Sequence, residues 1–389
     1  MCMKTIVMIG GHDETFLHYA GLGFDFIVLQ LPDSLGPNLT ALTDKIHIVS
    51  DFSEATVLGK MDEILKKHTV DFIFSFTEDG LLSAARASEH YAIAGMDFDT
   101  CELCVNKASM RAMLEDTEFS VRTEICRTQT DVEHFFNRQN GSIVLKDPKG
   151  SGSENVFIIK DATSLKSTLE QLPQDDFVML AEEFLDGREV SVETLTVDSK
   201  HRILAVTNKK LYRTSLAEEQ HIISPDNLDA DLFRQLAKYC ERLLTTINYK
   251  HGPCHIEVII TDGQFRLVEI NNRVGGDYIG LLVELTTGVD LFREPLQFHS
   301  SAADKSSSEK TACYEFAGSH LFYEPLETAL LMDVLQEVDI VRLIMGKANP
   351  PLNRSHTNDD KVGLVVIASH DRKKFYAAID HLNRLSSAN

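Results

Sequence analysis

The chain has 389 residues, of which 43% are hydrophobic and 25% are charged, the ordinary profile of a globular protein. At about 150 residues per domain, this length predicts two or three domains. Lysine and arginine number 38 and aspartate and glutamate 59, so the formal charge is −21. A surface this acidic argues against binding to nucleic acid or to an anionic membrane.

No run of about 18 apolar residues occurs, so we expect no membrane-spanning helix. The apolar run before Gly10-Gly11 is too short for a secretory signal, and seven scattered cysteines favour reduced thiols, so we expect a cytoplasmic protein. Cys101 and Cys104 form one Cys-x-x-Cys with no second pair at zinc spacing, and helical spacing explains them without metal or redox chemistry. A homodimer is our default expectation from the frequency of symmetric dimers.

Strand and helix patterns alternate over residues 1 to 105. Apolar runs predict strands at Thr5–Ile9, Phe26–Leu29, Ile46–Val49 and Val70–Phe76, and helices at Glu54–His68 and Leu81–Tyr91. This alternation predicts a parallel sheet with both faces covered. Gly10-Gly11 lacks the G-x-G-x-x-G pattern and indicates a tight turn rather than a dinucleotide site.

Short strands dominate the pattern from about residue 106 to residue 300. They are predicted at Ser142–Lys146, Val156–Ile159, Phe177–Ala181, Val190–Val197, Ile203–Thr207, His255–Ile260 and Phe265–Ile270. Apolar residues on one face predict a helix at Asp231–Ile247. The serine-rich segment Ala302–Lys310 indicates a loop or linker, and a strand at Val362–Ser369 precedes a final helix.

A glycine- and serine-rich loop follows the predicted strand that ends at Lys146. The segment Lys146–Val156 reads Lys-Asp-Pro-Lys-Gly-Ser-Gly-Ser-Glu-Asn-Val, and such a loop exposes backbone N–H groups that can bind phosphate. It is not a Walker loop, because no Gly-Lys-Ser/Thr stands at the required spacing. Taken alone, the loop fits either phosphate binding or a plain hairpin.

Two other polar segments stand on either side of this loop in the chain. Glu182 and Glu183 end an apolar strand, a turn follows at Gly187, and Glu189 begins the next strand, a pattern that by itself also fits a solvated turn. Ahead of the loop, the segment Val105–Arg111 by itself fits a helix start with solvated basic side chains.

Oxygen-bearing side chains on two successive strands give the strongest signal. His255 and Glu257 lie two residues apart, as do Glu269 and Asn271, so each pair shares one face of its strand. Two carboxylates and an amide oxygen suit Mg²⁺, which also binds substrate phosphates, and Arg273 follows where it could meet phosphate charge. The alternative is an exposed polar sheet face, but Glu257 and Glu269 interrupt strongly apolar strands.

In this order, from Lys107 to Arg273, the segments resemble the ATP-grasp superfamily. Within it, His255-Ile-Glu257, Glu269-Ile-Asn271-x-Arg273 and Glu219-Gln-His221-x-x-x-Pro225 are similar to bacterial L-amino-acid ligases, which join two free amino acids. The resemblance implies a mixed α/β and α+β chain with the ATP-grasp fold and an N-terminal parallel-sheet α/β domain. The implied domains are that α/β domain at 1–105, a mobile small lobe with the glycine loop at 106–190, a large lobe with the metal site at 191–300, and a part completing the large lobe at 301–389.

The resemblance also implies site residues. The implied nucleotide-binding set is Lys107, Lys146, Gly150, Ser151, Gly152, Ser153, Glu182, Glu183, Phe184, Leu185 and Glu189. In that set the two lysines contact the phosphates, Glu182 and the Leu185 backbone bind the adenine edge, and Glu189 holds the ribose. One or two Mg²⁺ ions, for which Mn²⁺ can substitute, are implied at Glu257, Glu269 and Asn271. Arg273 would stabilise phosphoryl and oxyanion charge, with Glu78, at the end of its strand, and His255 at the amino-acid pocket.

The sequence departs from the family pattern at two positions. The loop opens Lys146-Asp147-Pro148 instead of Lys-Pro, and Asn155 stands where a glycine is usual. Asparagine tolerates a left-handed backbone, so we expect the turn to survive. No biotin-attachment Met-Lys-Met motif occurs, which counts against a complete biotin-dependent carboxylase.

The activity that the resemblance implies is ATP-dependent ligation of two amino acids through an acyl phosphate, giving a dipeptide, ADP and phosphate. Two alternatives remain open: a carboxylase-type or purine-pathway enzyme acting on bicarbonate or a nucleotide intermediate, and a non-catalytic ATP-binding regulatory protein. The sequence does not identify the amino acids, although its acidic balance is compatible with a cationic substrate.

The metal assignment carries a geometric condition. Asp262-Gly263 favours a two-residue hairpin turn, which would place Glu257 and Glu269 on opposite faces of the sheet. We therefore predict either a three-residue loop, Thr261-Asp262-Gly263 with Gly263 left-handed and His255 opposite Glu269, or a bulge. A regular hairpin would exclude the metal site.

Overall fold

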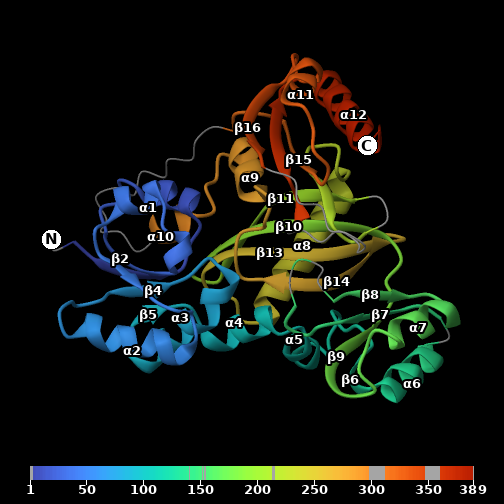
Figure 1. The fold of residues 1–389 in the computed structure, drawn as a ribbon, viewed down its shortest axis with the longest axis horizontal. Helices are drawn as coiled ribbons and strands as arrows, with labels where there is room; N and C mark the ends of the chain where they lie inside the picture. The colour runs from blue at the N-terminus through green and yellow to red at the C-terminus, as the bar shows by residue number, and fades with distance from the viewer. Residues whose placement is uncertain are drawn as a thin grey trace.

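In the computed structural model the described residues are 3–139, 141–150, 152, 155–212, 215–297, 312–346 and 360–388. They form three sheets (Figure 1): a parallel sheet beside the N-terminus, a large antiparallel sheet in the middle, and a small sheet with its own two helices. None of the helices in these ranges is long and apolar enough to cross a membrane.

The N-terminal sheet is parallel throughout, in the order β3-β2-β1-β4-β5. Its strands are β1 (Thr5–Ile9), β2 (Asp25–Gln30), β3 (Ile46–Ile48), β4 (Phe72–Phe74) and β5 (Ala94–Gly95). Its helical elements are η1 (Asp13–Tyr19), η2 (Pro32–Ser34), α1 (Pro37–Leu42), α2 (Glu54–Leu65), α3 (Glu78–His90) and α4 (Phe98–Val105). Successive β1 residues alternate between two buried clusters, one containing α2 and the other η1, so both faces are covered as predicted.

The small sheet is antiparallel, in the order β6-β9-β7-β8. It contains β6 (Thr123–Thr128), β7 (Ile143–Lys146), β8 (Phe157–Ile159) and β9 (Asp175–Glu183), with helices α6 (Gln129–Gln139) and α7 (Ala162–Leu169). Apolar side chains of β7 and β9 pack with α6 around Phe135 in a small separate core. The sequence pattern showed most of these strands but missed both helices.

The large sheet has eight strands in the order β14-β13-β10-β11-β12-β15-β17-β16. Its strands are β10 (Arg188–Val197), β11 (Lys200–Leu211), β12 (Glu218–Ile223), β13 (Gly252–Thr261), β14 (Gln264–Asn271), β15 (Phe316–Phe322), β16 (Asp339–Met345) and β17 (Gly363–Ser369). The helices of this part are α5 (Lys107–Met113), α8 (Ala230–Thr246), α9 (Ile279–Thr287), α11 (Thr328–Val334) and α12 (Arg372–Ala388), whereas α10 (Glu294–Gln297) packs through Leu296 on the core of the N-terminal domain (Figure 1). The C-terminal strands thus continue the sheet that carries the predicted metal residues.

The amphipathic helix predicted at Asp231–Ile247 is α8, and it begins after Asp229, whose side chain accepts from the N–H groups of residues 231 and 232. Its apolar face packs on β10 and β13 through Leu236, Cys240 and Leu243. Helix α5 joins the same core, although the chain before β6 was predicted to begin the small lobe. This packing fixes Lys107, the first residue of α5, against the large sheet. The predicted linker Ala302–Lys310 lies outside the described residues.

Candidate active-site cleft

The hairpin β13–β14 has a regular turn and an irregular strand. Thr261 pairs with Gln264, and both intervening residues, Asp262 and Gly263, are left-handed at φ 50° and 76°. This is the two-residue turn that Asp-Gly favours, so the three-residue loop was a wrong prediction.

The predicted bulge is confirmed. The pairing register shifts between Glu257 and Val258, so that one residue of β14, Val268, has no partner of its own. Glu257 then lies opposite Glu269, and His255 opposite Asn271 rather than opposite Glu269. Opposed residues share a sheet face, so the condition for a shared metal site is met.

The two opposed carboxylates each have a lysine partner. Lys107 Nζ lies 3.0 Å from Glu269 Oε2, and Asn271 donates its amide N–H to Glu269 Oε1 at 2.8 Å. Lys209, on β11, binds Glu257. Burial would raise the pKa of Glu257, but Lys209 and His255 outweigh it and lower that pKa to about 2. Lys107 and Lys209 therefore contact the two carboxylates that are predicted to bind Mg²⁺.

Lys209 is shared among three carboxylates. Its Nζ lies 2.8 Å from Glu218 and 3.6 Å from Glu189 in addition to Glu257, and its side chain is 3% exposed. Burial and then the charge of Glu257 raise the pKa of Glu189 to about 7. Three carboxylates around one lysine leave an excess of negative charge that a divalent cation would offset.

His255 is buried between two carboxylates. Its Nδ1 lies 2.9 Å from Glu193 Oε2, and its Nε2 lies 3.3 Å from Glu257 Oε1. Glu193 also accepts from Ser191 and Thr207 at 2.7 and 3.1 Å. Burial lowers the pKa of His255, but Glu193 and Glu257 raise it to about 9, so the imidazole is held as a fixed cation.

The start of the β9–β10 connection is a buried ion cluster. Glu182 accepts from Arg111 Nε at 2.7 Å and Nη2 at 3.1 Å, and Lys146 Nζ lies 2.8 Å from Glu182 Oε2. Burial would raise the pKa of Glu182, but Lys146 and Arg111 outweigh it and lower the pKa to about 2. Arg111 and Lys146 already bind the Glu182 carboxylate, so Glu182 would contact the adenine of a nucleotide through its backbone. The solvated interpretations were therefore wrong for Glu182 and Arg111, which are buried, whereas the turn at Asp186–Arg188 is exposed.

Arg111 also contacts the bulge. Its Nη2 donates to the carbonyl of Val268 at 2.7 Å. One buried guanidinium thus joins the bulge of β14 to the segment Glu182–Leu185, which we call the hinge. Gly187 brings the hinge close to β13, because a Cβ there would stand 2.4 Å from Thr261 Oγ1. These contacts fix the position of the hinge relative to Glu257 and Glu269.

The glycine loop lies beside Lys107. The Lys107 N–H donates to the Pro148 carbonyl at 2.8 Å, and its Nζ donates to the Gly150 carbonyl at 2.7 Å. Asn155 is left-handed at φ 52°, as expected for the position where the family has glycine. Two predicted residues of this loop, Ser151 and Ser153, lie outside the described residues.

Glu78 contacts Arg273 across domains. Its Oε2 accepts from Nη2 at 2.8 Å and from Nε at 3.2 Å. Glu78 was expected at the end of a strand, but it is the first residue of α3, since the helix begins three residues earlier than predicted. The N-terminal domain thus contributes a carboxylate directly beside the arginine that follows β14.

These groups line one cleft of about 590 Å³, a size typical of ligand sites. The predicted residues that line it are Lys107, Lys146, Gly150, Gly152, Glu182–Leu185, Glu189, His255, Glu257, Glu269, Asn271 and Arg273. Glu78 reaches the cleft through Arg273. The structure thus brings together every predicted site residue that it describes, while their roles stay predictions.

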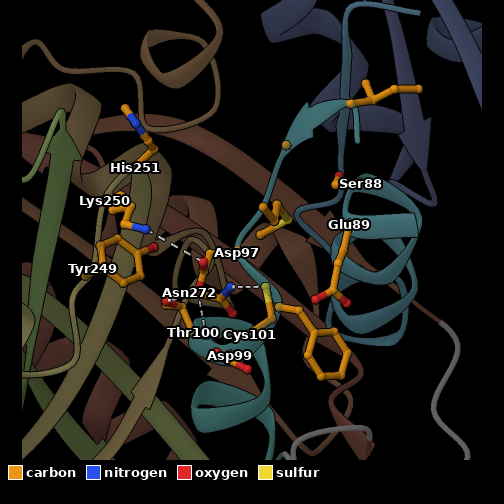
Figure 2. A pocket seen from close by; sticks show the side chains of 14 residues that line it. Ser88, Glu89, Asp97, Asp99, Thr100, Cys101, Tyr249, Lys250, His251 and Asn272 are labelled. Carbon is orange, nitrogen blue, oxygen red and sulfur yellow. Dashed lines mark hydrogen bonds and ion pairs between the residues drawn. The ribbon is translucent and has the colours of Figure 1, made fainter. Parts of the chain in front are cut away.

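The side chain of Asn272 points away from this cleft. Neighbours Asn271 and Arg273 line the cleft, whereas Asn272 lines a separate cavity of about 340 Å³ between the N-terminal domain and the segment Tyr249–His251. Figure 2 shows its amide near Cys101 of α4, with Nδ2 3.0 Å from Sγ. Cys101 is therefore a packing and anchoring residue that helps to hold the end of β14.

Sequence reasoning missed several charged residues in or beside the cleft, among them Arg111, Glu193, Lys209, Glu218 and Asp277. Arg111 lies one helical turn after Lys107, a spacing that could have placed both on one helix face. Glu193 is a charged residue within the largely apolar strand β10, the same signal that identified Glu257, whereas Lys209 lies in the polar stretch Asn208–Lys210 of β11. No local signal marks Asp277.

The donor set fits Mg²⁺. Glu257, Glu269 and Asn271 offer hard oxygen ligands on one face, and the negative charge around Lys209 exceeds what that lysine neutralises. Lys107 and Lys146 at the neighbouring wall suit phosphate oxygens. The cleft can therefore take a metal–phosphate group.

Comparisons with known proteins agree with this geometry. Residues 139–280 match the model of the ATP-grasp domain. A curated relative from Bacillus subtilis, an L-arginine-specific L-amino acid ligase, is 26% identical over 65% of this chain and 63% of its own length. The alignment thus spans slightly less than two thirds of that relative.

Solved structures resemble nearly the whole chain. An L-amino acid ligase from Bacillus licheniformis has a TM-score of 0.81 at 19% identity, covering 98% of this chain and 97% of its own. An N5-carboxyaminoimidazole ribonucleotide synthetase in complex with ADP has a TM-score of 0.75 at 16% identity, covering 98% and 96%. At these identities the likeness establishes the fold alone.

Proposed function

The chain carries an ATP-grasp domain within an ATP-grasp fold, and on that premise we propose that it is an ATP-dependent carboxylate–amine ligase that joins two amino acids. The observation that supports the proposal most is the bulged hairpin, which sets Glu257 opposite Glu269 with Asn271 on the same face and Arg273 directly after. A protein that only bound ATP would not need Arg273 and Glu78 beside the predicted Mg²⁺ ligands.

The proposed reaction begins with a poor electrophile. A carboxylate resists attack because its leaving group would be an oxide, and phosphorylation by ATP converts it into an acyl phosphate. Mg²⁺ bound at Glu257, Glu269 and Asn271 would neutralise charge on the transferred phosphate. Lys107 and Lys146 neutralise further phosphate charge, which lets the anionic carboxylate approach in line.

The second half of the proposed reaction is attack by an amine on the acyl carbonyl. Arg273 offers a planar pair of donors to the developing oxyanion, and phosphate then leaves. Glu78, beside Arg273, is placed to accept hydrogen bonds from an ammonium group of an amino acid. His255, held cationic by Glu193, adds positive charge on the same face. The products are a dipeptide, ADP and phosphate.

The test is phosphate release from Mg·ATP with panels of amino acids, alone and in pairs, followed by mass spectrometry of the products. We expect release that requires two amino acids and a product of dipeptide mass. Release that requires bicarbonate instead would support the carboxylase-type alternative. ATP binding without release in any panel would support the regulatory alternative.

The Glu257→Gln variant is the matched control. It preserves the side-chain volume and removes one anionic ligand, so it should depress any release that occurs in this cleft. Release that the variant does not lower comes from a contaminating phosphatase or ATPase.

A further inference from the structure

The carboxylate of Asp277 lines the cleft, and the proposed nucleotide, metal and oxyanion roles leave it unused. Asp277 lines the cleft four residues after Arg273, and its side chain is 8% exposed. Five other acidic residues of the described lining already bind lysines of the cleft, namely Glu182, Glu189, Glu218, Glu257 and Glu269. Glu183 binds Arg122 and Arg266, and Asp147 accepts from the Lys149 N–H. The partner of Asp277 is Lys361, which does not line the cleft.

The backbone that presents Asp277 is strained. Asp277 and Tyr278 are consecutive left-handed residues, at φ 49° and 66°, and for a bulky residue such as tyrosine this conformation is a genuine outlier. Strain of this kind concentrates at ligand sites and persists where the surroundings hold it. Here the Tyr278 hydroxyl donates to Glu14 of the N-terminal domain at 2.6 Å, and the Arg342 guanidinium lies 6.0 Å from the Tyr278 ring centroid. Asp277 is therefore fixed in position.

The contact with Lys361 shows that the Asp277 carboxylate binds a cationic group. The ammonium of Lys361 binds the Asp277 carboxylate from the segment before β17, and the lysine side chain is 38% exposed. An exposed lysine exchanges its partner for another cation at small cost, because most of its charge is already solvated. The Asp277 carboxylate is 8% exposed and therefore gains more than Lys361 does from a cationic partner.

We propose that Asp277 is a specificity-determining residue that selects an amino-acid substrate with a cationic side chain, whose guanidinium or ammonium group replaces Lys361. The inference rests on the proposed function, since it takes the carboxylate and α-ammonium of that substrate to lie at Arg273 and Glu78. A neutral side chain of the same shape would not replace Lys361 and would gain no binding free energy from Asp277.

The first experiment measures direct binding, which does not depend on turnover. Calorimetry compares arginine with citrulline, its neutral isostere, and lysine with norleucine, in the full chain with a non-hydrolysable ATP analogue and Mg²⁺. We expect arginine and lysine to bind about tenfold or more tightly than their isosteres, because a site built for a polar group rejects the analogue that lacks it. Equal affinities within each pair would overturn the proposal.

The second experiment uses variants that fit the local backbone. Asp277→Asn keeps the size, and asparagine tolerates the left-handed conformation, so the variant should fold. We expect its arginine-to-citrulline affinity ratio to fall to about one, whereas Lys361→Met, which removes the internal competitor, should lower the Kd for arginine. An unchanged ratio in Asp277→Asn would remove Asp277 from substrate selection.

Turnover then separates the two proposals. Phosphate release with neutral and cationic amino acids at equal kcat/KM would contradict the specificity inference alone. No release with any amino acid pair would contradict the proposed function, and the binding ratios would still decide the role of Asp277.

Discussion

The two ends of the cleft hold their charges in different ways. At the hinge end, the side chains of Arg111, Glu182 and Lys146 are 1%, 5% and 7% exposed, and the carboxylate contacts three nitrogen atoms of two cationic side chains. At the other end, the side chains of Glu78 and Arg273 are 28% and 21% exposed and form a single pair. Breaking a buried pair strands a charge, whereas a partly exposed pair exchanges partners at small cost. The hinge pairs therefore stabilise the site, and the pairs at the arginine end are suited to exchange with substrate charges.

The largest effect is expected from breaking the hinge cluster. Arg111→Met should lower the free energy of unfolding by roughly 3–5 kcal/mol, because it leaves Glu182 buried with one partner and the Val268 carbonyl without its donor. Urea unfolding measures this. The matched control is Arg242→Met, which removes a pair with Glu118 whose side chains are 52% and 50% exposed and should cost less than about 1 kcal/mol. Equal losses in both variants would contradict the distinction between buried and exchangeable pairs.

The pH dependence of stability tests the same cluster. The pKa of Glu182 is lowered from 4.5 to about 2 in the fold, so its contribution is fully present above pH 4.5 and is lost as pH falls through 2. At 1.36 kcal/mol per unit, the contribution is about 3 kcal/mol at neutral pH. The difference in unfolding free energy between wild type and Glu182→Gln should shrink by about 2 kcal/mol from pH 6 to pH 3. A difference in unfolding free energy that does not change with pH would show that Lys146 and Arg111 do not lower the pKa of Glu182.

At the other end, Arg273→Lys should spare the fold and impair the reaction. Lysine keeps a charge but lacks the planar fork that can contact two oxygens. We expect ATP binding to persist and the rate of phosphate release to fall by about 10²-fold or more, the scale for removing one oxyanion donor. Activity within a few-fold of wild type would exclude Arg273 from the mechanism.

The smallest effect is expected between the two ends of the cleft, at Glu257 and Glu269, the carboxylates predicted to bind Mg²⁺. Glu269→Gln preserves shape and removes one anionic ligand, so the Mg²⁺ concentration for half-maximal phosphate release should rise by about tenfold or more. A Mg²⁺ titration of initial rates measures the shift, with urea unfolding as the check that the fold persists. A titration that matches wild type at sub-millimolar Mg²⁺ would mean that the metal site is misplaced.

Local pattern predicted most of the strands, helix α8 and the candidate metal-binding face of β13 and β14, whereas the other site residues came from the family resemblance. The alternation of β1 between two apolar faces, the amphipathic face of α8 and the charged residues inside β13 and β14 are properties of segments shorter than about 20 residues, so they are visible in the sequence. The helices α6 and α7 escaped because their apolar faces cover only a small sheet, which leaves a weak pattern.

The register of the hairpin lay beyond local pattern. Asp262-Gly263 favours a regular two-residue turn, and the turn is indeed regular; the bulge lies further along the strand, at Val268. The carbonyl of Val268 accepts from Arg111, which is 157 positions away in the chain. The prediction of an odd loop or a bulge came from the requirement that both carboxylates share a face in order to bind one metal ion.

The sequence by itself determined which residue types reach the cleft, because strand periodicity places side chains two apart on one face whatever the rest of the chain does. Only the tertiary structure decided what each charged side chain binds: Glu182 with Arg111, Glu257 with Lys209, and Asp277 with Lys361. Electrostatic partners are chosen by proximity in space at low dielectric, and proximity between segments from different sheets and helices has no signature in either segment.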